Sequence, residues 1–189
     1  IGASWTYRIT DPANPGNPAE LKTSTVEAFE AVPDDPGQMA FRVRTEKTNG
    51  VTLSWQQDLG DRVVRLREEV YDLAGATLEA IETYAPSKLR LDESAAHIAS
   101  GAAWTVTYDE TDTDLIAGGG PTTLSKNEDW TVVGVDVPVT VDAVAYSALE
   151  LHRVGTTTGS DKLYWFARGV GKIKETGGQT EELTDYTLP

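Results

Sequence analysis

Bulky apolar residues alternate with polar ones along much of the chain, and this alternation restricts its fold more than any other feature. The period of two is clear in residues 39–44, 51–56, 64–67 and 104–108. A strand with one buried face produces this period, whereas an amphipathic helix repeats every 3.6 residues. The alternation therefore predicts half-buried antiparallel strands.

Turn-forming residues separate these stretches. Asn49-Gly50 is a strong hairpin signal, because both residues tolerate positive φ. Segments rich in glycine, proline or aspartate predict further turns or loops at residues 11–18, 34–37, 118–121 and 177–178. The three prolines within residues 11–18 exclude that segment from a sheet interior.

Only residues 92–100 have a helical pattern, with Asp92 as the N-cap and Gly101 as the stop. The remaining pattern predicts about eleven strands, since strands are short and bounded by turn residues. We therefore expect an all-β chain with at most one short helix. A large antiparallel curved sheet, a sandwich and a half-barrel are all compatible with this pattern.

Four stretches of the first half recur in the same order in the second half. Residues 2–6 resemble 101–105, 53–55 resemble 163–165, 64–68 resemble 172–175, and 78–86 resemble 180–189. The alternative is chance, because Trp-Thr and Leu-x-Trp are common in strands. We expect a single domain over residues 1–189 made of two related halves, 1–86 and 101–189, joined by residues 87–100. Trp5 should then correspond to Trp104, and Trp55 to Trp165.

Composition excludes several kinds of site and partner. The chain has no cysteine, so disulfides, thiolate metal ligands and cysteine nucleophiles are excluded. Its two histidines leave little room for a multi-histidine metal site. The formal net charge of −14 repels nucleic acid and anionic lipid surfaces, so we expect no nucleic-acid partner.

The location of the chain is predicted from what its sequence lacks. No apolar run approaches the roughly 20 residues that span a bilayer as a helix, so we expect no transmembrane segment in this chain. The sequence begins at Ile1 without an initiator methionine. A removed secretion signal, or a lipobox carrying a lipid anchor, would explain that beginning. We therefore expect the periplasm, the outer membrane or the extracellular space.

Residues 164–175, with the sequence YWFARGVGKIKE, carry a family resemblance. Together with residues 139–151, the opening residues 5–8 and residues 71–75, they resemble uncharacterised bacterial cell-envelope proteins, the TapB-like and DUF3108-like lipoproteins of myxobacteria and related lineages. The resemblance implies a cell-envelope location and a sheet-dominated fold akin to the LolA/LolB-like half-barrel. That family has no established catalytic residues, so none is transferred to this chain.

Four carboxylates within six residues form the one candidate metal site: Asp109, Glu110, Asp112 and Asp114. Oxygen-rich clusters suit Ca²⁺. An EF-hand loop that begins at Glu110 would need glycine at position 115, which is Leu115. A solvated acidic loop is the favoured interpretation, and an irregular calcium site is the alternative. We expect no cofactor.

Aromatic residues are the candidate ligand contacts: Trp55, Trp130, Tyr164 and Trp165. Burial of an indole stabilises a fold by a few kcal/mol, about what a large buried side chain contributes. Tryptophans on the apolar face of a strand are therefore first interpreted as core. Aromatic rings also line lipid and carbohydrate pockets, and an unfilled curved sheet would present them to a ligand.

These patterns lead to one expected function and two alternatives. We expect a non-enzymatic envelope protein that is structural or binds a hydrophobic, lipid-like ligand in a sheet cavity. The first alternative is a carbohydrate-binding or adhesion module that uses exposed aromatics. A hydrolase with dispersed carboxylates is the second, because spacing in sequence says little about spacing across a sheet.

Overall fold

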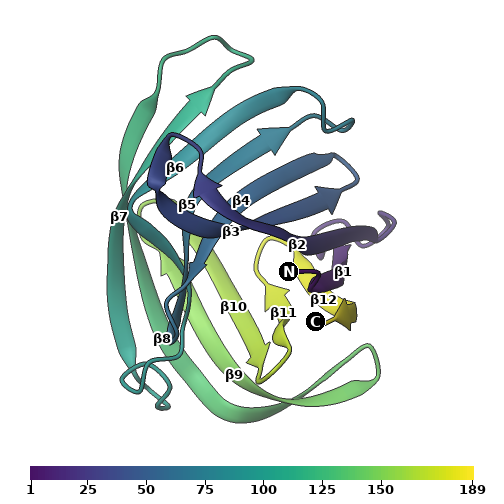
Figure 1. Ribbon diagram of the computed structural model, residues 1–189. Helices are drawn as coiled ribbons and strands as arrows, with labels where there is room; N and C mark the ends of the chain where they lie inside the picture. Colours follow the sequence, from purple (N-terminus) through teal and green to yellow (C-terminus); the bar gives the residue numbers. More distant parts are fainter.

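The computed structural model describes residues 1–189, and all of its regular secondary structure is β-strand (Figure 1). The chain forms β1 (Ser4–Thr10), β2 (Glu20–Val32), β3 (Asp35–Lys47), β4 (Gly50–Asp58), β5 (Arg62–Tyr71), β6 (Leu78–Asp92), β7 (Ala103–Asp114), β8 (Thr122–Val141), β9 (Val144–Gly155), β10 (Ser160–Ala167), β11 (Gly171–Thr176) and β12 (Thr180–Thr187). The structure contains no helix with the length and apolar composition that crossing a membrane requires.

Each strand pairs antiparallel with the strand before and after it, and β1 also pairs with β12, so the sheet closes into a barrel. Closure gives every strand a partner on both sides, although β6 and β7 pair over only part of their lengths. The prediction of an all-β, antiparallel fold is confirmed. The structure has one strand more than the expected eleven, and its single sheet is closed rather than open.

The predicted helix at residues 92–100 is wrong. Asp92 is the last residue of β6, and its carboxylate accepts a hydrogen bond of 2.9 Å from the Ser94 backbone N–H. The other carboxylate oxygen lies 2.8 Å from Nδ1 of His97. The following residues form turns and bends only. A short polar side chain that bonds nearby backbone in this way favours a turn over a helix.

Residues 87–100 are not a separate join, because β6 continues to Asp92. β6 pairs with β7 only from Ala80 to Ala85. Beyond the cis peptide bond between Ala85 and Pro86, β6 leaves β7 and pairs only with β5. We call residues 62–65 and 88–92 the β5–β6 arm.

The β5–β6 arm packs across the barrel interior. Val64 and Leu89 of the arm form one apolar cluster with Trp130, Leu151 and Tyr164 of β8, β9 and β10. This cluster fills one part of the barrel. Because the arm carries lysine and arginine as well as apolar residues, its position also brings cations into the interior.

The long hairpin of β8 and β9 fills another part. Val141, at its tip, is 1 % exposed and packs with Tyr7 of β1, Ile173 of β11 and Leu183 of β12. Asp142 at the same tip forms an ion pair with Arg8. The two apolar clusters leave the remaining interior without a filled apolar core.

The matching stretches of the two halves lie six strands apart. Trp5 is the second residue of β1 and Trp104 the second of β7. Trp55 lies in β4 and Trp165 in β10. The stretches at 64–68 and 172–175 lie in β5 and β11, and those at 78–86 and 180–189 include parts of β6 and β12.

The backbone shares this spacing. Gly2 and Gly101 both have positive φ, at 86° and 81°. The N–H of Gly2 donates to the Val26 carbonyl and the N–H of Gly101 to the Val132 carbonyl, at 2.8 and 2.9 Å. In return Val26 donates to Ala3, and Val132 to Ala102. A β-bulge follows both valines, since the register shifts directly after each one.

Candidate functional site

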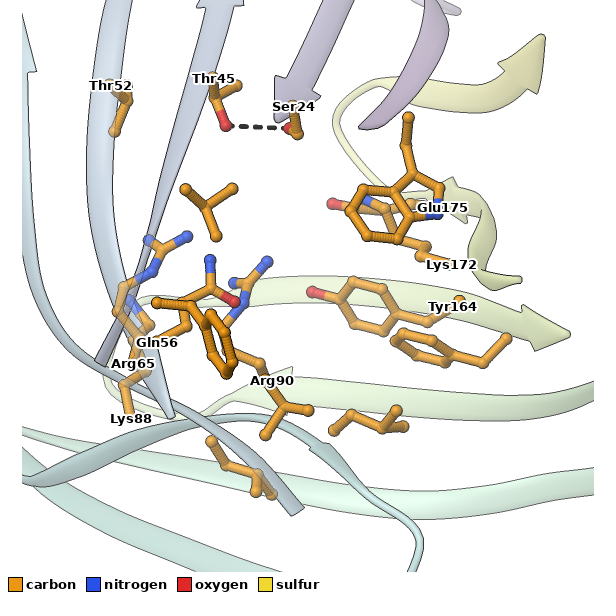
Figure 2. A pocket seen from close by; sticks show the side chains of 18 of the residues that line it. Ser24, Thr45, Thr52, Gln56, Arg65, Lys88, Arg90, Tyr164, Lys172 and Glu175 are labelled. Carbon is orange, nitrogen blue, oxygen red and sulfur yellow. Dashed lines mark hydrogen bonds and ion pairs between the residues drawn. The ribbon is translucent and has the colours of Figure 1, made fainter. Parts of the chain in front are cut away.

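One cavity of about 690 Å³ lies inside the barrel (Figure 2). It follows β4 from Thr52 to Asp58 and is lined by side chains of the strands and of the β5–β6 arm. Lys47 and Asp58, near the two ends of β4, are exposed lining residues, so the cavity reaches the surface. Its volume falls within the range of about 300–1,000 Å³ that is typical of small-molecule sites.

The cavity is positively charged although the chain is strongly acidic. Half of the 16 lysines and arginines line it: Lys22, Lys47, Arg65, Lys88, Arg90, Arg153, Lys162 and Lys172. Only four carboxylates line it: Asp58, Glu68, Glu175 and Glu181. The excess of cations inside the barrel therefore has the opposite sign to the net charge of −14.

A chain of ion pairs connects β2, β10, β11 and β12 in the cavity wall. Lys172 Nζ lies 2.7 Å from Glu181, and it also pairs with Glu175. Lys162 Nζ lies 2.6 Å from Glu175 on its other side, and Lys22 pairs with Glu181. Burial raises the pKa of Glu175, but Lys172 and Lys162 lower it by a larger amount, so the net pKa lies well below the usual range. Both lysines thus hold Glu175 ionised.

Among the ion pairs of the cavity wall, Lys22 is a cation whose pKa is lowered toward neutral pH. Burial lowers its pKa, Lys172 lowers it further, and Glu181 opposes both, which leaves the pKa at about 8. The ammonium groups of Lys22 and Lys172 also each lie 5.1 Å from the centroid of the Tyr7 ring. Charge in this wall therefore changes a little above neutral pH.

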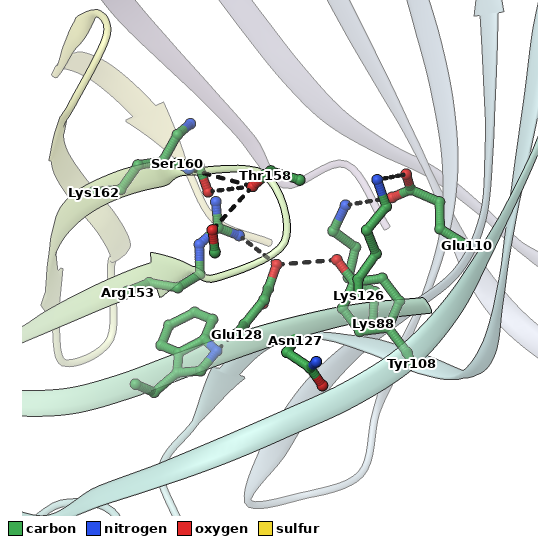
Figure 3. A network of polar contacts seen from close by, with 12 residues as sticks. Lys88, Tyr108, Glu110, Lys126, Asn127, Glu128, Arg153, Thr158, Ser160 and Lys162 are labelled. Atoms are coloured by element: carbon green, nitrogen blue, oxygen red, sulfur yellow. Dashed lines mark hydrogen bonds and ion pairs between the residues drawn. The ribbon is translucent and has the colours of Figure 1, made fainter. Parts of the chain in front are cut away.

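A second polar network lies beside the cavity, around a small pocket of about 100 Å³ (Figure 3). Glu128 accepts hydrogen bonds from the Tyr108 hydroxyl at 3.0 Å and from Arg153 at 3.2 Å. Glu110 pairs with Lys88 at 3.3 Å and with Lys126 at 3.1 Å. Lys88 and Arg153 line both this pocket and the main cavity, so the two spaces share a wall.

Arg90 is the enclosed cation without a protein partner. It lines the cavity from the β5–β6 arm and makes no ion pair or side-chain hydrogen bond (Figure 2). Burial lowers the pKa of Arg90, but Tyr164, Glu175 and Glu68 together raise it by a larger amount, so the guanidinium stays charged. Figure 2 shows Gln56, Arg65 and Lys88 on one side of the cavity and Tyr164, Lys172 and Glu175 on the other.

The position of the cavity follows from a difference between the two halves. Ser24 stands two residues before Val26, as Trp130 stands two before Val132. The residue paired with Ser24 is Thr45, whereas the residue paired with Trp130 is Arg153, a larger side chain.

The same contrast recurs on β4 and β10. Gln56 follows Trp55, where the bulky Phe166 follows Trp165. Thr52 of β4 likewise corresponds to Lys162 of β10. Thr52 pairs with Thr45 on the strand before it, and Lys162 pairs with Arg153 on the strand before it. Small polar residues on β2, β3 and β4 thus leave open the space that larger side chains occupy in the second half.

The structure separates the four aromatic residues that the sequence singles out as ligand contacts. Trp130 and Tyr164 line the cavity and stack at 5.8 Å between ring centroids. Trp55 does not line the cavity: it is 3 % exposed and donates a hydrogen bond to Glu30. Trp165 also lies outside the cavity lining and packs against the apolar cluster around Ile173.

The four candidate metal ligands do not converge. Strand alternation on β7 directs Glu110 inward, where it pairs with two lysines, and leaves Asp109 exposed on the opposite face. Asp112 is exposed, and the Asp114 carboxylate accepts hydrogen bonds from the backbone of Ile116 and Ala117. No group of three or more histidine, cysteine or acidic residues lies within reach of one metal ion.

The cations of the cavity are the residues that sequence reasoning missed. Alternation assigns Arg65 and Arg67 to one face of a strand, but a bulge at Leu66 separates them: Arg65 lines the cavity and Arg67 does not. The alternating Lys88-Leu89-Arg90-Leu91 was the available signal. A period of two shows which residues share a face and not which face is enclosed.

Comparison with known proteins adds no family assignment: no protein-family model, no curated protein and no solved structure matches this chain.

Proposed function

We propose that this chain is a non-enzymatic binding protein that encloses a small amphiphilic, lipid-like molecule in the barrel cavity. The observation that carries the proposal is the cavity of about 690 Å³, which is continuous with the surface and lined by both apolar and charged side chains. A barrel that served only as a scaffold would gain stability by filling this space, because close packing of the interior is favourable.

The apolar part of a ligand has a defined surface to contact. Apolar side chains of the lining are Val26, Phe41, Val43, Val63, Leu89, Leu91 and Phe166. They come from β2 and β3 on one side and from the β5–β6 arm and β10 on the other. Burial of apolar surface contributes about 25 cal/mol per Å², so an alkyl chain against these residues supplies most of the affinity.

The carboxylates of the cavity support binding rather than catalysis. Glu175 and Glu181 are held by lysines, and both have pKa values lowered by those lysines against the effect of burial. A general acid or base works best with a pKa near the working pH. His97 and His152 lie outside the lining, where they contact Asp92 and Asp161.

A cell-envelope location is part of the same proposal. It rests on the resemblance of residues 164–175 to envelope lipoproteins. The glycan-binding alternative has less support, because it needs indoles exposed to solvent, whereas Trp55 and Trp130 are 3 % and 2 % exposed.

Titration with alkyl compounds and glycans tests the proposal. Trp5 and Trp130 line the cavity, so a bound ligand changes the intrinsic fluorescence of the protein. We expect saturable binding of ten-carbon alkyl compounds by fluorescence and calorimetry, and no binding of oligosaccharides. A control variant, Trp165→Phe, should keep both the heat of binding and the fluorescence change, because Trp165 does not line the cavity. Absence of any heat and any fluorescence change with all alkyl compounds would overturn the proposal, and binding of glycans alone would favour the alternative.

A further inference from the structure

One enclosed cation inside the barrel has no ion-pair partner. Arg65 pairs with Glu68, and Arg153 with Glu128. Lys88 pairs with Glu110. The ion-pair chain accounts for the other enclosed lysines, Lys22, Lys162 and Lys172. Arg90 has no such partner (Figure 2).

An unpaired guanidinium in the interior is unfavourable unless something solvates it. Burial of a charge costs several kcal/mol when no opposite charge or hydrogen-bond acceptor is near. Arg90 carries five N–H donors in a planar fork that matches a carboxylate or a phosphate. Since its side chain faces the cavity, the contents of the cavity must supply the acceptors.

Neighbouring groups increase the preference for an anion. The two guanidiniums of Arg65 and Arg153 also line the cavity, and the Nε atom of each is buried without a hydrogen-bond partner. Glu68 and Glu175 lie near enough to favour the charged form of Arg90, but each is paired with another cation and neither is bonded to Arg90. A neutral ligand would leave this excess of positive charge uncompensated, and a cationic ligand would add to it.

We propose that the ligand carries an anionic head group, a carboxylate or a phosphate monoester, and that Arg90 binds it. This inference rests on the proposed function, because it names the chemical class of the molecule that the cavity encloses. The head group is bound beside Arg90, and the alkyl chain lies along the apolar lining from β2 and β3. Because half of the cations of this acidic chain line the cavity, the cavity selects against neutral and cationic amphiphiles.

Three ten-carbon probes test the inference on the unmodified protein: decanoate, decyl phosphate and decanol. We expect at least one anion to bind tenfold or more tightly than decanol, since a hydrogen bond to a charged group contributes enough free energy for a tenfold gain in affinity. The ratio between decanoate and decyl phosphate then identifies the head group. Equal affinity for decanol and both anions would overturn the inference and leave the proposed function intact. No binding of any probe would overturn both.

Two variants assign the preference to Arg90. Arg90→Met keeps the aliphatic length and removes the charge, so we expect the affinity for the anion to fall tenfold or more and that for decanol to stay unchanged. Arg168→Met is the matched control, because Arg168 is exposed, forms no ion pair and does not line the cavity. If Arg90→Met does not fold, Arg90→Gln replaces it, with circular dichroism as the check. An unchanged preference for the anion in a folded Arg90 variant would overturn the assignment.

Discussion

The ammonium group of Lys174 lies 5.8 Å from the centroid of the Trp165 ring. Six strands earlier, the guanidinium of Arg67 lies 6.0 Å from the centroid of Trp55. In both places the cation stands directly opposite the tryptophan in the strand register, and a β-bulge follows the tryptophan. The same cation–π contact thus occurs once in each half of the barrel.

The neighbouring charges repeat as well. Arg65 pairs with Glu68 three residues later in β5, and Lys172 pairs with Glu175 three residues later in β11. Together with the positive φ of both Gly2 and Gly101, these contacts support the prediction of two related halves. The expected correspondence of Trp55 with Trp165 is the part of that prediction with the most specific support.

A double-mutant cycle in each half measures the repeated contact. A cation–π pair contributes about 0.5–1 kcal/mol when exposed and about 2 kcal/mol when desolvated. Because Arg67 is 5 % exposed and Lys174 is half-buried, we expect the coupling of Trp55 with Arg67 to exceed that of Trp165 with Lys174. The substitutions are Trp→Leu, Arg67→Met and Lys174→Met, and urea denaturation gives the free energy of unfolding.

The crossed pair, Trp55 with Lys174, is the control for these cycles. No contact joins these two residues, so their effects should add to within about 0.5 kcal/mol. Zero coupling in both genuine pairs would show that the contacts contribute nothing to stability.

The sequence was sufficient for most of the strands and turns, because alternation and turn residues act locally. The turn predicted at residues 34–37 is an exception, since β3 begins at Asp35. Asn49-Gly50 lies where β3 turns into β4, as predicted. The same local rules did not predict closure of the sheet, which depends on pairing between Trp5 of β1 and Tyr186 of β12, 181 positions later in the chain. Nor did they predict the turn that follows Asp92 at the end of β6, because a helical cap and a turn require the same residue type.

The site was less predictable than the fold. Trp130 and Tyr164 were identified because large aromatic residues stand out in an alternating strand. Arg90 was not, because the bend of β6 after Ala85 turns its segment away from β7 and into the barrel. That bend is a tertiary feature, and without it Lys88 and Arg90 have the pattern of an ordinary solvated strand face.

Removal of the Glu175 carboxylate should change how stability depends on pH. The pKa of Glu175 is lowered in the folded protein, since the lysines outweigh the effect of burial. Its unfolded pKa is about 4.3, so its contribution is fully present above that pH and is lost as the pH falls toward the folded value. Loss of one partner of a buried pair costs about 3–5 kcal/mol. We expect Glu175→Gln to be less stable than the wild type by that amount at pH 7.

Urea denaturation at pH 7, 5, 4 and 3 tests this dependence. The gap in free energy of unfolding between wild type and Glu175→Gln should narrow as the pH falls below 5. Glu20→Gln is the control, because Glu20 is exposed and forms no ion pair, and its gap should stay near zero. A Glu175→Gln gap that is the same at every pH would contradict the expected ionisation.

Affinity for an anionic ligand should fall as the pH rises through 8. The pKa of Lys22 is about 8, lowered first by burial and then by Lys172, and Lys22 lines the cavity. Between pH 7 and pH 9.5 it loses its proton while a bound carboxylate stays charged. Loss of one cation from the cavity wall removes part of the Coulomb attraction for the ligand, which weakens binding about fivefold at an intermediate dielectric constant.

Calorimetric titration with decanoate at pH 7, 8 and 9.5 measures the effect. Lys22→Gln should bind more weakly than wild type at pH 7 and show no further loss at pH 9.5. Decanol affinity should be independent of pH in both proteins. A pH dependence that survives in Lys22→Gln would contradict this assignment and point to another cation of the cavity, such as Lys88, whose pKa is lowered by burial.

A large side chain at Ser24 should occupy part of the cavity and weaken ligand binding. Ser24 lines the cavity and takes the position that Trp130 has in the second half, where the indole is 2 % exposed. Ser24→Phe removes the 2.9 Å hydrogen bond to Thr45 but gains apolar burial inside a barrel that has space for the ring. We therefore expect a folded variant with a melting temperature at or above that of wild type and weaker binding of both decanoate and decanol. Thr25→Phe, which lies one residue further on the opposite face of β2, is the control and should bind like wild type. Because the two substitutions add the same side chain to neighbouring residues of one strand, a loss of binding in both would point to a general disturbance of β2. A folded Ser24→Phe variant that binds decanoate normally would place the ligand outside the cavity.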